Sequence, residues 1–243
     1  MQQKMNQADL MFRKFQVWKF RRRNAVPAVF MAIQVNAEEL VRRKNEINLP
    51  GKAAAHVTVT HMVIKAVADV LVRYPLLYSF YSGKKAIENP ELVVNVPVDV
   101  GNHVEYIVIH SPETKTLPDI AMECKNEIEN IRKGDGQFIH FLEQLNKTPL
   151  HLFFENGRDI LGITRKYYGN FPISNFGSFG VSHGFLALSQ PIVAGLCIGT
   201  LDQGNLPITI SFDHRVVDGA YVGRFLNEVK RALESFSTKG ESL

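Results

Sequence analysis

The sequence predicts a mixed α/β fold, and three observations support that prediction. Amphipathic segments with helical spacing alternate with short apolar or alternating segments that are typical of strands. Apolar residues make up 45% and charged residues 21% of the 243 residues, which is ordinary for a globular protein. No internal repeat or low-complexity linker interrupts the chain. We therefore expect one domain over residues 1–243, with a flexible tail at about 237–243.

Several segments show the 3.6-residue spacing of amphipathic helices, bounded by recognisable end signals. The first interleaves basic and aromatic residues and ends before Asn24-Ala25-Val26-Pro27, because proline disfavours helix in the residue before it. Thr58 or Thr60 can cap the third helix, and Gly134-Asp135-Gly136 ends the fourth. The expected helices cover residues 8–24, 37–47, 61–73, 118–132 and 220–236, with a short one at 138–145.

Strands are expected where apolar residues alternate with other residues or run together. In residues 28–36 the large aliphatic side chains fall on one face and a mixed set falls on the other. Gly101-Asn102 separates two β-rich runs and predicts a hairpin. The expected strands cover residues 28–36, 92–100, 104–109, 171–175, 192–200 and 206–212.

Charge and hydropathy narrow the classes of partner. The formal net charge is +4 and the pI is about 9.0, a mild basicity that is compatible with an anionic ligand such as a phosphorylated cofactor, with nucleic acid, or with no particular partner. The basic first segment matches no known nucleic-acid module. No apolar run is long enough to span a bilayer, and the start lacks a secretory signal. We expect neither nucleic acid nor a membrane as partner, and a cytoplasmic protein, or a mitochondrial matrix one if the source is eukaryotic.

Cysteine and histidine usage argues against disulfides and metals. Cys124 and Cys197 are far apart in the sequence and are expected to be free, inert thiols in a reducing compartment. The histidines outside the motif described next show no ligand spacing, so no metal site is expected.

The segment Ser211-Phe212-Asp213-His214-Arg215-Val216-Val217-Asp218-Gly219-Ala220 places a histidine at the end of an alternating strand. Rigid scaffolds present reactive groups at strand ends and in loops. Histidine has an unperturbed pKa of about 6.5 and a thiol one of about 8.5, so histidine can take a proton from a thiol at modest cost. His214 is therefore a candidate general base for a thiol. Considered without its neighbours, His214 would be a hydrogen-bonded structural residue and Asp218 a helix N-cap.

A second motif, Phe171-Pro172-Ile173-Ser174-Asn175-Phe176-Gly177-Ser178-Phe179-Gly180, follows another expected strand. On its own, Ser174-Asn175 is an ordinary turn pair before a glycine. Gly177 to Gly180 is too short to indicate a phosphate-binding loop.

Together the two motifs resemble those of the chloramphenicol acetyltransferase-like acyltransferases. The first matches their His-x-x-x-Asp-Gly signature. Its form Asp-His-Arg-Val-Val-Asp-Gly-Ala resembles the catalytic domain of the dihydrolipoyl acyltransferases of 2-oxoacid dehydrogenase complexes. The second is similar to that family's Thr-Ile-Ser-Asn-Leu-Gly-x-x-Gly segment. Weaker similarities at 57–75, 92–99 and 190–199 extend the resemblance from about residue 12 to 236.

This resemblance implies a chloramphenicol acetyltransferase-like two-layer α/β sandwich with a mixed sheet, forming a single acyltransferase catalytic domain. It implies acyl transfer between coenzyme A and a thiol such as dihydrolipoamide. His214 would be the general base, Ser174 the hydrogen-bond donor to the oxyanion, and Asp218 the anchor of the turn. Three further motif residues are expected to bind coenzyme A: Asn175, Arg215 and Gly219.

The resemblance also implies an assembly. Members of this family are trimers with sites between subunits, so we expect a homotrimer or larger assembly in which His214 of one chain faces Ser174 of its neighbour. The family acid that matches Asp218 often pairs with an arginine near the chain start, for which Arg22 or Arg23 is the candidate. The basic first helix would then support the site instead of only facing solvent.

The sequence departs from the family in three places. There is no Asp-Lys-Ala lipoyl signature and no subunit-binding domain, so we expect no covalent lipoyl group on this chain and a lipoyl domain or a small thiol acting in trans. The family's Gly-Leu-Ile-Thr-Pro-Val stretch is replaced at 104–109, and residues 148–170 do not follow the family closely. Two alternatives therefore stay open: an O-acetyltransferase of the chloramphenicol acetyltransferase type, and a catalytically inactive trimeric scaffold. Arg215 favours the dehydrogenase-complex branch.

Overall fold

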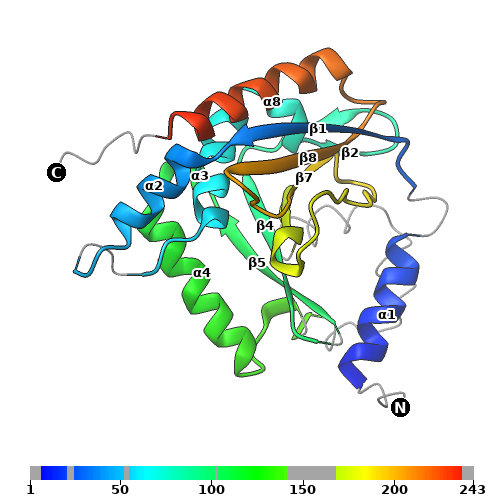
Figure 1. Ribbon diagram of the computed structural model, residues 1–243. Helices are drawn as coiled ribbons and strands as arrows, with labels where there is room; N and C mark the ends of the chain where they lie inside the picture. The colour runs from blue at the N-terminus through cyan, green and yellow to red at the C-terminus, as the bar shows by residue number, and fades with distance from the viewer. Residues whose placement is uncertain are drawn as a thin grey trace.

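A six-stranded mixed sheet organises the computed structural model, which describes residues 7–20, 25–51, 55–101, 103–138, 140–141 and 168–236 (Figure 1). The strand order is β1-β8-β7-β6-β4-β5. β6 runs parallel to β4 and β7, and the other neighbouring pairs are antiparallel. The strands of this sheet are β1 (Ala28–Asn36), β4 (Val93–Asp99), β5 (Val104–His110), β6 (Phe171–Asn175), β7 (Ala194–Ile198) and β8 (Asn205–Asp213). The predicted mixed α/β class and the predicted β4–β5 hairpin are confirmed.

Four helices cover one face of this sheet and enclose the hydrophobic core, giving the two layers that the sequence predicts (Figure 1). α3 packs against α8 and α4, while α8 also contacts β1 and α4 contacts β5. The apolar stripe of α3 is buried along nearly its whole length, as expected for a helix with apolar residues on several faces. The four helices are α2 (Glu38–Ile47), α3 (Val59–Leu71), α4 (Leu117–Arg132) and α8 (Gly219–Glu234).

Three short 3₁₀ helices and a second, two-stranded sheet complete the described chain. The 3₁₀ helices are η2 (Pro75–Tyr78), η3 (Pro112–Thr114) and η4 (Phe176–Phe179). The small sheet is a hairpin of β2 (Phe80–Tyr81) and β3 (Ala86–Ile87), which the sequence analysis did not predict. An isolated bridge between Phe80 and Ile192 ties this hairpin to the chain that enters β7, and Phe80 is fully buried. Two-residue strands are too short to show a periodic pattern in the sequence.

β1 has the boundaries and the two faces that its alternating sequence predicts. Val35 is fully buried, and Val29, Met31 and Ile33 are partly buried against the core. From Phe30 to Asn36 the alternate residues are exposed, including Phe30 with 52% of its surface accessible. β1 is an edge strand of the sheet, so one of its faces can stay in contact with solvent while the other packs on the helices.

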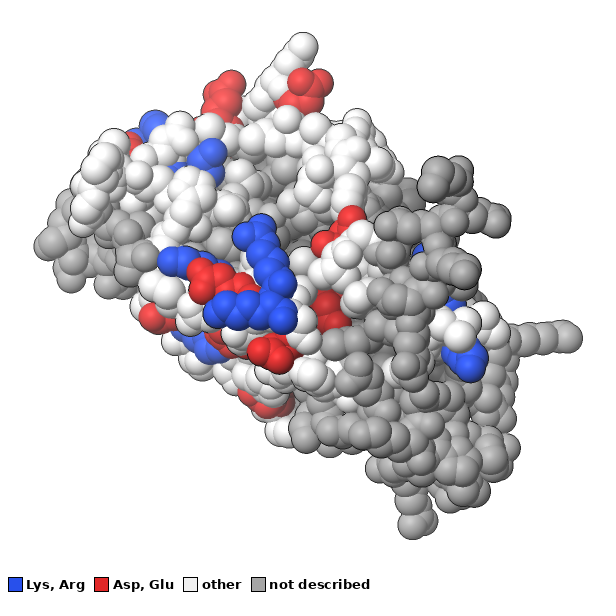
Figure 2. Space-filling model, turned by 90° about the horizontal axis from the view of Figure 1, so that it is seen from below, with Lys and Arg blue, Asp and Glu red and all other residues white. Residues whose placement is uncertain are grey.

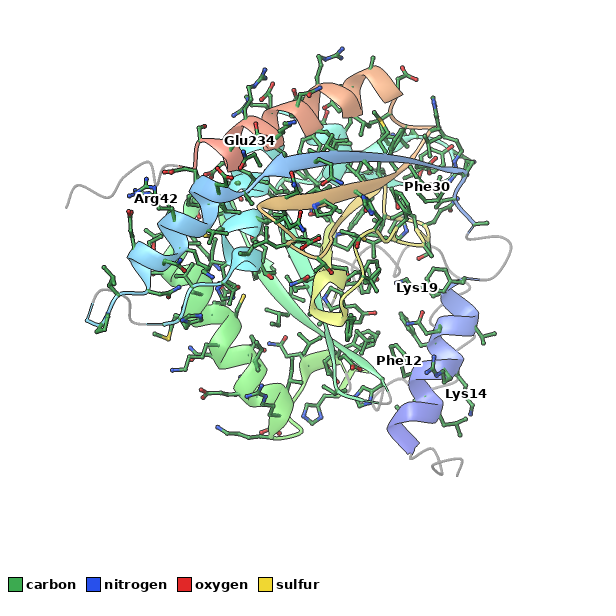
Figure 3. All side chains as sticks on the ribbon, viewed as in Figure 1. Phe12, Lys14, Lys19, Phe30, Arg42 and Glu234 are labelled. Carbon is green, nitrogen blue, oxygen red and sulfur yellow. The ribbon has the colours of Figure 1, made fainter. Side chains whose placement is uncertain are left out.

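The first helix, α1 (Gln7–Lys19), stands apart from α2, α3, α4 and α8 (Figure 1). It ends earlier than the predicted range of 8–24, and residues 21–24 lie outside the described part of the chain. Phe12 and Lys19 extend toward the body of the molecule, whereas Lys14 lies on the outer side (Figure 3). Phe12 packs against the ring of Phe138, with centroids 6.5 Å apart. Lys19 is nearly buried and donates a hydrogen bond to the hydroxyl of Tyr168. The helix therefore combines a solvated basic face with one inward-facing cation.

Acidic and basic side chains are intermixed on the face of the molecule shown in Figure 2. Pairing within and next to helices accounts for part of this mixture. In α2, Arg42 contacts both Glu39 and Glu46, and Lys115 pairs with Glu123 of α4 at 2.5 Å. Exposed pairs of this kind contribute little stability each, on the order of 0–1 kcal/mol.

The two cysteines behave as the sequence predicts. Cys124 and Cys197 are free and buried. Burial raises the pKa of each thiol to about 12, so both stay protonated near neutral pH. Among the described residues, no helix is both long and apolar enough to cross a membrane. The same residues contain no group of three or more histidine, cysteine or acidic side chains that could hold a metal ion.

The N-terminus of α3 carries a reciprocal capping box that depends on a neutral histidine. The hydroxyl of Thr58 accepts a hydrogen bond from the His61 backbone N–H, and Nδ1 of His61 accepts one from the Thr58 backbone N–H. Of the two threonines that the sequence offers, Thr58 is therefore the cap. Burial lowers the pKa of His61 to about 4, with a smaller contribution from His56. His61 is neutral at pH 7, which is the state that can accept this bond.

We predict that His61 makes stability depend on pH between about 6.5 and about 4. The folded-state pKa lies below the ordinary value of about 6.5, so the unfolded chain takes up the proton first and folding loses free energy as the pH falls through this window. His61→Gln keeps a side-chain acceptor at this position but does not titrate. Urea unfolding at pH 7, 5.5 and 4 should show that the parent loses on the order of 1–3 kcal/mol more than this variant. A difference between the two proteins that does not change with pH would contradict the prediction.

Candidate active site

His214 projects from the end of β8, one residue beyond the paired part of the strand. Asp213 pairs with Ala28 as the last step of the β1–β8 register, and the His214 backbone N–H donates to the Pro27 carbonyl at 3.3 Å. About half of the His214 side chain is exposed, at 48%. The sequence positions it this way because β8 ends in a tight turn, in which the backbone N–H groups of Val216 and Val217 both donate to the Asp213 carbonyl. The ring is therefore held at the sheet end and remains reachable from outside.

The residues on either side of His214 are joined to each other. Asp213 is fully buried, and its carboxylate accepts the Arg215 backbone N–H at 3.0 Å. The Arg215 guanidinium donates to both carboxylate oxygens, at 2.9 Å from Nε and 2.7 Å from Nη2. This hydrogen bonding raises the pKa of Arg215 above its usual value. Arg215, which the sequence predicts to bind coenzyme A, has its guanidinium engaged by Asp213.

Asp218 and Gly219 occupy the start of α8. Asp218 is the N-cap residue, yet its side chain makes no capping hydrogen bond and is 87% exposed. Its Oδ1 lies 3.9 Å from Nδ1 of His214, which is too long for a hydrogen bond and close enough for an ion pair with a protonated ring. A Cβ atom added at Gly219 would meet nothing within 4 Å. Asp218 therefore faces solvent beside the His214 ring, and the space next to Gly219 is open.

Ser174 lies on β6 in the middle of the sheet. It pairs with Cys197 on β7, and Cys197 pairs with Thr209 on β8, so the three residues form one row across the sheet. Ser174 is 6% exposed. Its hydroxyl has no hydrogen-bond partner among the described residues, so it is available as a donor to a bound group.

At the end of β6, the side-chain amide of Asn175 makes hydrogen bonds through both its oxygen and its nitrogen. Its Oδ1 accepts the Ser178 backbone N–H, which caps η4, and its Nδ2 donates to Thr60 on the first turn of α3 at 2.9 Å. The chain then passes so close to β7 that a Cβ at Gly177 would lie 2.4 Å from the Gly199 carbonyl oxygen. Only glycine fits there, and the strand end that carries Ser174 is fixed on both sides.

The register keeps Ser174 and His214 of one chain apart. His214 lies five residues beyond Thr209 along β8, about 16 Å, and β8 lies two strand spacings, about 10 Å, from β6. The two Cα atoms are therefore roughly 19 Å apart. The structure brings His214 together with Asp218 and Arg215, and Ser174 with Asn175, but it does not join these two groups within one chain.

Sequence reasoning missed three residues that shape these groups: Asp213, Tyr81 and Thr60. The Arg215 guanidinium carbon lies 4.5 Å from the centroid of the Tyr81 ring, a contact between residues far apart in the sequence. The opposite charges of Asp213 and Arg215, two positions apart around a histidine, are a local signal that could have indicated the ion pair. Arg22 and Arg23, named as possible partners of Asp218, lie outside the described residues.

Comparison with known proteins gives a consistent result. The family model of the 2-oxoacid dehydrogenases acyltransferase (catalytic domain) matches residues 12–141 and 166–239. The lipoamide acyltransferase component of the branched-chain alpha-keto acid dehydrogenase complex of Bacillus subtilis is 25% identical over 90% of this chain and 49% of its own length. The dihydrolipoyllysine-residue acetyltransferase component of the acetoin cleaving system of the same organism is 28% identical over 73% of this chain and 41% of its own. The chain thus spans about half the length of these relatives.

Solved structures agree on the fold. A probable dihydrolipoamide acetyltransferase from Listeria monocytogenes superposes with a TM-score of 0.77 at 22% identity, covering 100% of this chain and 98% of that one. The dihydrolipoamide acetyltransferase of Azotobacter vinelandii gives 0.70 at 20% identity, with coverage of 92% and 88%. A chloramphenicol acetyltransferase gives 0.53 at 13% identity, covering 96% and 100%. The fold is therefore that of chloramphenicol acetyltransferase, as expected from the two motifs.

We predict that Thr60 holds the strand end that carries Ser174. Thr60→Val removes the acceptor for Asn175 Nδ2 and should lower the free energy of unfolding by about 1 kcal/mol, because a partly buried donor loses its partner. Thr60→Ser keeps the hydroxyl and should stay close to the parent. Thermal and urea unfolding measure the difference. Loss of stability in Thr60→Ser but not in Thr60→Val would mean that the methyl packing of Thr60, and not the hydrogen bond, is what matters.

Proposed function

Because the chain belongs to the family of 2-oxoacid dehydrogenase acyltransferase catalytic domains, we propose that it transfers an acyl group between coenzyme A and a thiol such as dihydrolipoamide. Two polar side chains at strand ends carry this proposal. The exposed His214 follows the end of β8, and Ser174, whose hydroxyl has no partner in the described chain, lies near the end of β6. Acyl transfer needs both a base for the thiol and a donor for the oxyanion.

In the proposed reaction, His214 takes the proton of the attacking thiol and the thiolate sulfur forms a bond to the thioester carbonyl carbon. The carbonyl oxygen becomes an oxyanion, to which the Ser174 hydroxyl donates a hydrogen bond. When the tetrahedral intermediate collapses, the bond to the original sulfur breaks and that thiolate recovers the proton from His214. Asp218 lies close enough to form an ion pair with the ring while it carries the proton.

A relative supports these roles. In the dihydrolipoamide acetyltransferase of Azotobacter vinelandii, a serine, a histidine and an asparagine four residues after the histidine have been investigated for their role in the catalytic mechanism. This chain has the same spacing between His214 and Asp218, with an aspartate in the place of the asparagine. We propose that Asn175 and Gly219 border the path of coenzyme A and that Arg215 acts there through its pairing with Asp213.

We further propose that each site forms between two copies of the chain, in a homotrimer or a larger assembly. A separation of roughly 19 Å prevents Ser174 and His214 of one chain from acting on the same carbonyl group, whose reacting atoms must lie within hydrogen-bond reach of both. A head-to-tail contact that closes into a ring brings the His214 end of one chain to the Ser174 end of the next. The acceptor thiol would be carried by a lipoyl domain or be a small molecule.

Exposed apolar side chains near both ends support this arrangement. Phe30 of β1 lies opposite Ser211, near the His214 end (Figure 3). Its ring packs on that of Phe185 with centroids 5.1 Å apart, and both side chains stay about half exposed. Phe179 and Val181 follow β6 at the Ser174 end and are 63% and 43% exposed. Exposed apolar side chains are typical of protein interfaces, and here they lie beside both His214 and Ser174.

We predict that complementation between two inactive variants will reveal the shared site. His214→Ala should lower kcat by about 10²–10⁴-fold and Ser174→Ala by about 10²–10³-fold, measured as thiol release from acyl-coenzyme A with dihydrolipoamide as acceptor. When equal amounts of the two variants are unfolded together and reassembled, about a quarter of the interfaces should combine an intact histidine with an intact serine. Activity should return toward about a quarter of the parent value.

The controls separate the alternatives. Each variant reassembled alone should stay inactive, and a mixture that stays inactive while the assembly is intact would contradict the shared site. Acetyl, succinyl and branched acyl donors are each tested. Turnover with chloramphenicol in place of dihydrolipoamide would indicate an O-acetyltransferase. No turnover with any donor from an intact assembly would indicate a scaffold.

We predict that charge placed on the proposed interface will dissociate the assembly. Phe179→Asp should shift the mass measured by sedimentation from trimer or larger to monomer, because a carboxylate buried between subunits is costly to desolvate. Val72→Asp is the matched control, since Val72 is also an exposed apolar residue, at 46%, but lies at the end of α3 on the helical side of the fold. Retention of the parent mass by Phe179→Asp, or equal dissociation by both variants, would exclude this surface.

A further inference from the structure

Three residues form a bracket around His214: Asp213, Arg215 and Tyr81. The carboxylate of Asp213 binds both the backbone N–H and the guanidinium of Arg215. The peptide units immediately before and after His214 therefore belong to residues that are joined side chain to side chain. These contacts restrain the backbone on both sides of the His214 ring.

The ring of Tyr81 contacts the Arg215 guanidinium. The Arg215 guanidinium carbon lies 4.5 Å from the centroid of the Tyr81 ring, within the range of a cation–π contact. The Arg215 side chain is 33% exposed, so water reaches it, whereas Asp213 is fully buried. A guanidinium free to turn into solvent would leave that buried carboxylate without its charged partner, which is a costly state. The aromatic face limits this motion.

The backbone that carries the Tyr81 ring is held by contacts with neighbouring segments. The Tyr81 backbone N–H donates to the Pro191 carbonyl at 2.8 Å, and Tyr81 pairs with Ala86 in the β2–β3 hairpin. The neighbouring Phe80 is fully buried and bridges to Ile192. The hairpin therefore presents Tyr81 to Arg215 from a position fixed against the chain that enters β7.

We propose that Tyr81 is a positioning residue for His214: its ring holds Arg215 in the bidentate pair with Asp213, and that pair fixes the backbone on both sides of the base. The proposal rests on the proposed function of His214 as the base. It assigns a task to the β2–β3 hairpin, which otherwise contributes only four residues of sheet. Tyr81 itself does not touch the reacting atoms.

The test compares Tyr81→Leu with Tyr81→Phe in the thiol-release assay. Leucine fills similar space without an aromatic face, and kcat should fall about tenfold, while KM for acyl-coenzyme A stays within about twofold. Phenylalanine keeps the ring face and should recover most of the lost kcat. Tyr78→Leu is the matched control, because Tyr78 precedes the same hairpin and is not part of the bracket. A tenfold loss in the control, or an equal loss in both Tyr81 variants, would overturn the proposal.

A double-mutant cycle adds a readout that a merely structural role would not change. Arg215→Lys keeps the charge but loses the planar, bidentate geometry and the stacking on the ring. If Tyr81 acts through Arg215, Tyr81→Leu should lower kcat much less in the Arg215→Lys background than in the parent. Independent, multiplicative losses would contradict the inference. Thermal unfolding of all four proteins shows whether each variant is folded under the conditions of the assay.

Direct observation of His214 separates this inference from the proposed function. In the ¹³C-histidine NMR spectrum, the His214 signal is identified by its absence from His214→Ala. It should be a single sharp signal in the parent and broadened or split in Tyr81→Leu, because the loosened bracket admits more than one ring orientation. An unchanged signal in Tyr81→Leu would contradict the bracket. An active His214→Ala variant would instead contradict the role of His214 as the base, whatever the spectrum shows.

Discussion

The register of β6, β7 and β8 is the constraint on which the proposed site depends. It sets Ser174 and Thr209 in one row and leaves His214 five residues further along β8. A one-residue slip would turn each side chain of the strand to the opposite face, so the buried apolar residues of β8 fix this register firmly. Once the register is fixed, no side-chain rotation brings the two groups together within a chain. The proposed chemistry, which uses both groups on one carbonyl, therefore requires two chains.

Each half of the proposed site is held by its own local contacts, which suits a site completed only on assembly. At the serine end, Asn175 is tied to Thr60 of α3 and to the backbone of η4. At the histidine end, Arg215 is tied to Asp213 and packed on Tyr81. These contacts already exist in the single chain, so the side chains need little further ordering when two chains meet. A preorganised half-site loses less conformational entropy on assembly than a mobile one.

The sequence predicted the parts of the fold that depend on local pattern. The boundaries of β1 followed from its alternation, and the α3 cap followed from the threonines before an apolar stripe. The His214 and Ser174 motifs were recognised because each is a continuous segment. Contacts between distant segments were not predictable in this way. Tyr81 and Arg215 are separated by most of the chain, and two-residue strands such as β2 show no period. The contact of Arg215 with Tyr81 is of this non-local kind, whereas its pair with Asp213 joins residues two positions apart.

The replaced stretch at 104–109, which kept the scaffold alternative open, has an explanation within the chain. Tyr106 is 7% exposed, and its ring packs edge-on against Phe138 and Tyr168, each with centroids 4.8 Å away. Burial raises the pKa of Tyr106 well above its ordinary value, so it stays neutral. Phe138 in turn packs against Phe12 and Phe15 of α1. The substituted residue thus serves the docking of α1 onto β5. On the sheet, β5 is separated from β6 by β4, and from β8 by three strands. The replaced stretch therefore contacts a helix at the far edge of the sheet, away from the strand ends that carry Ser174 and His214.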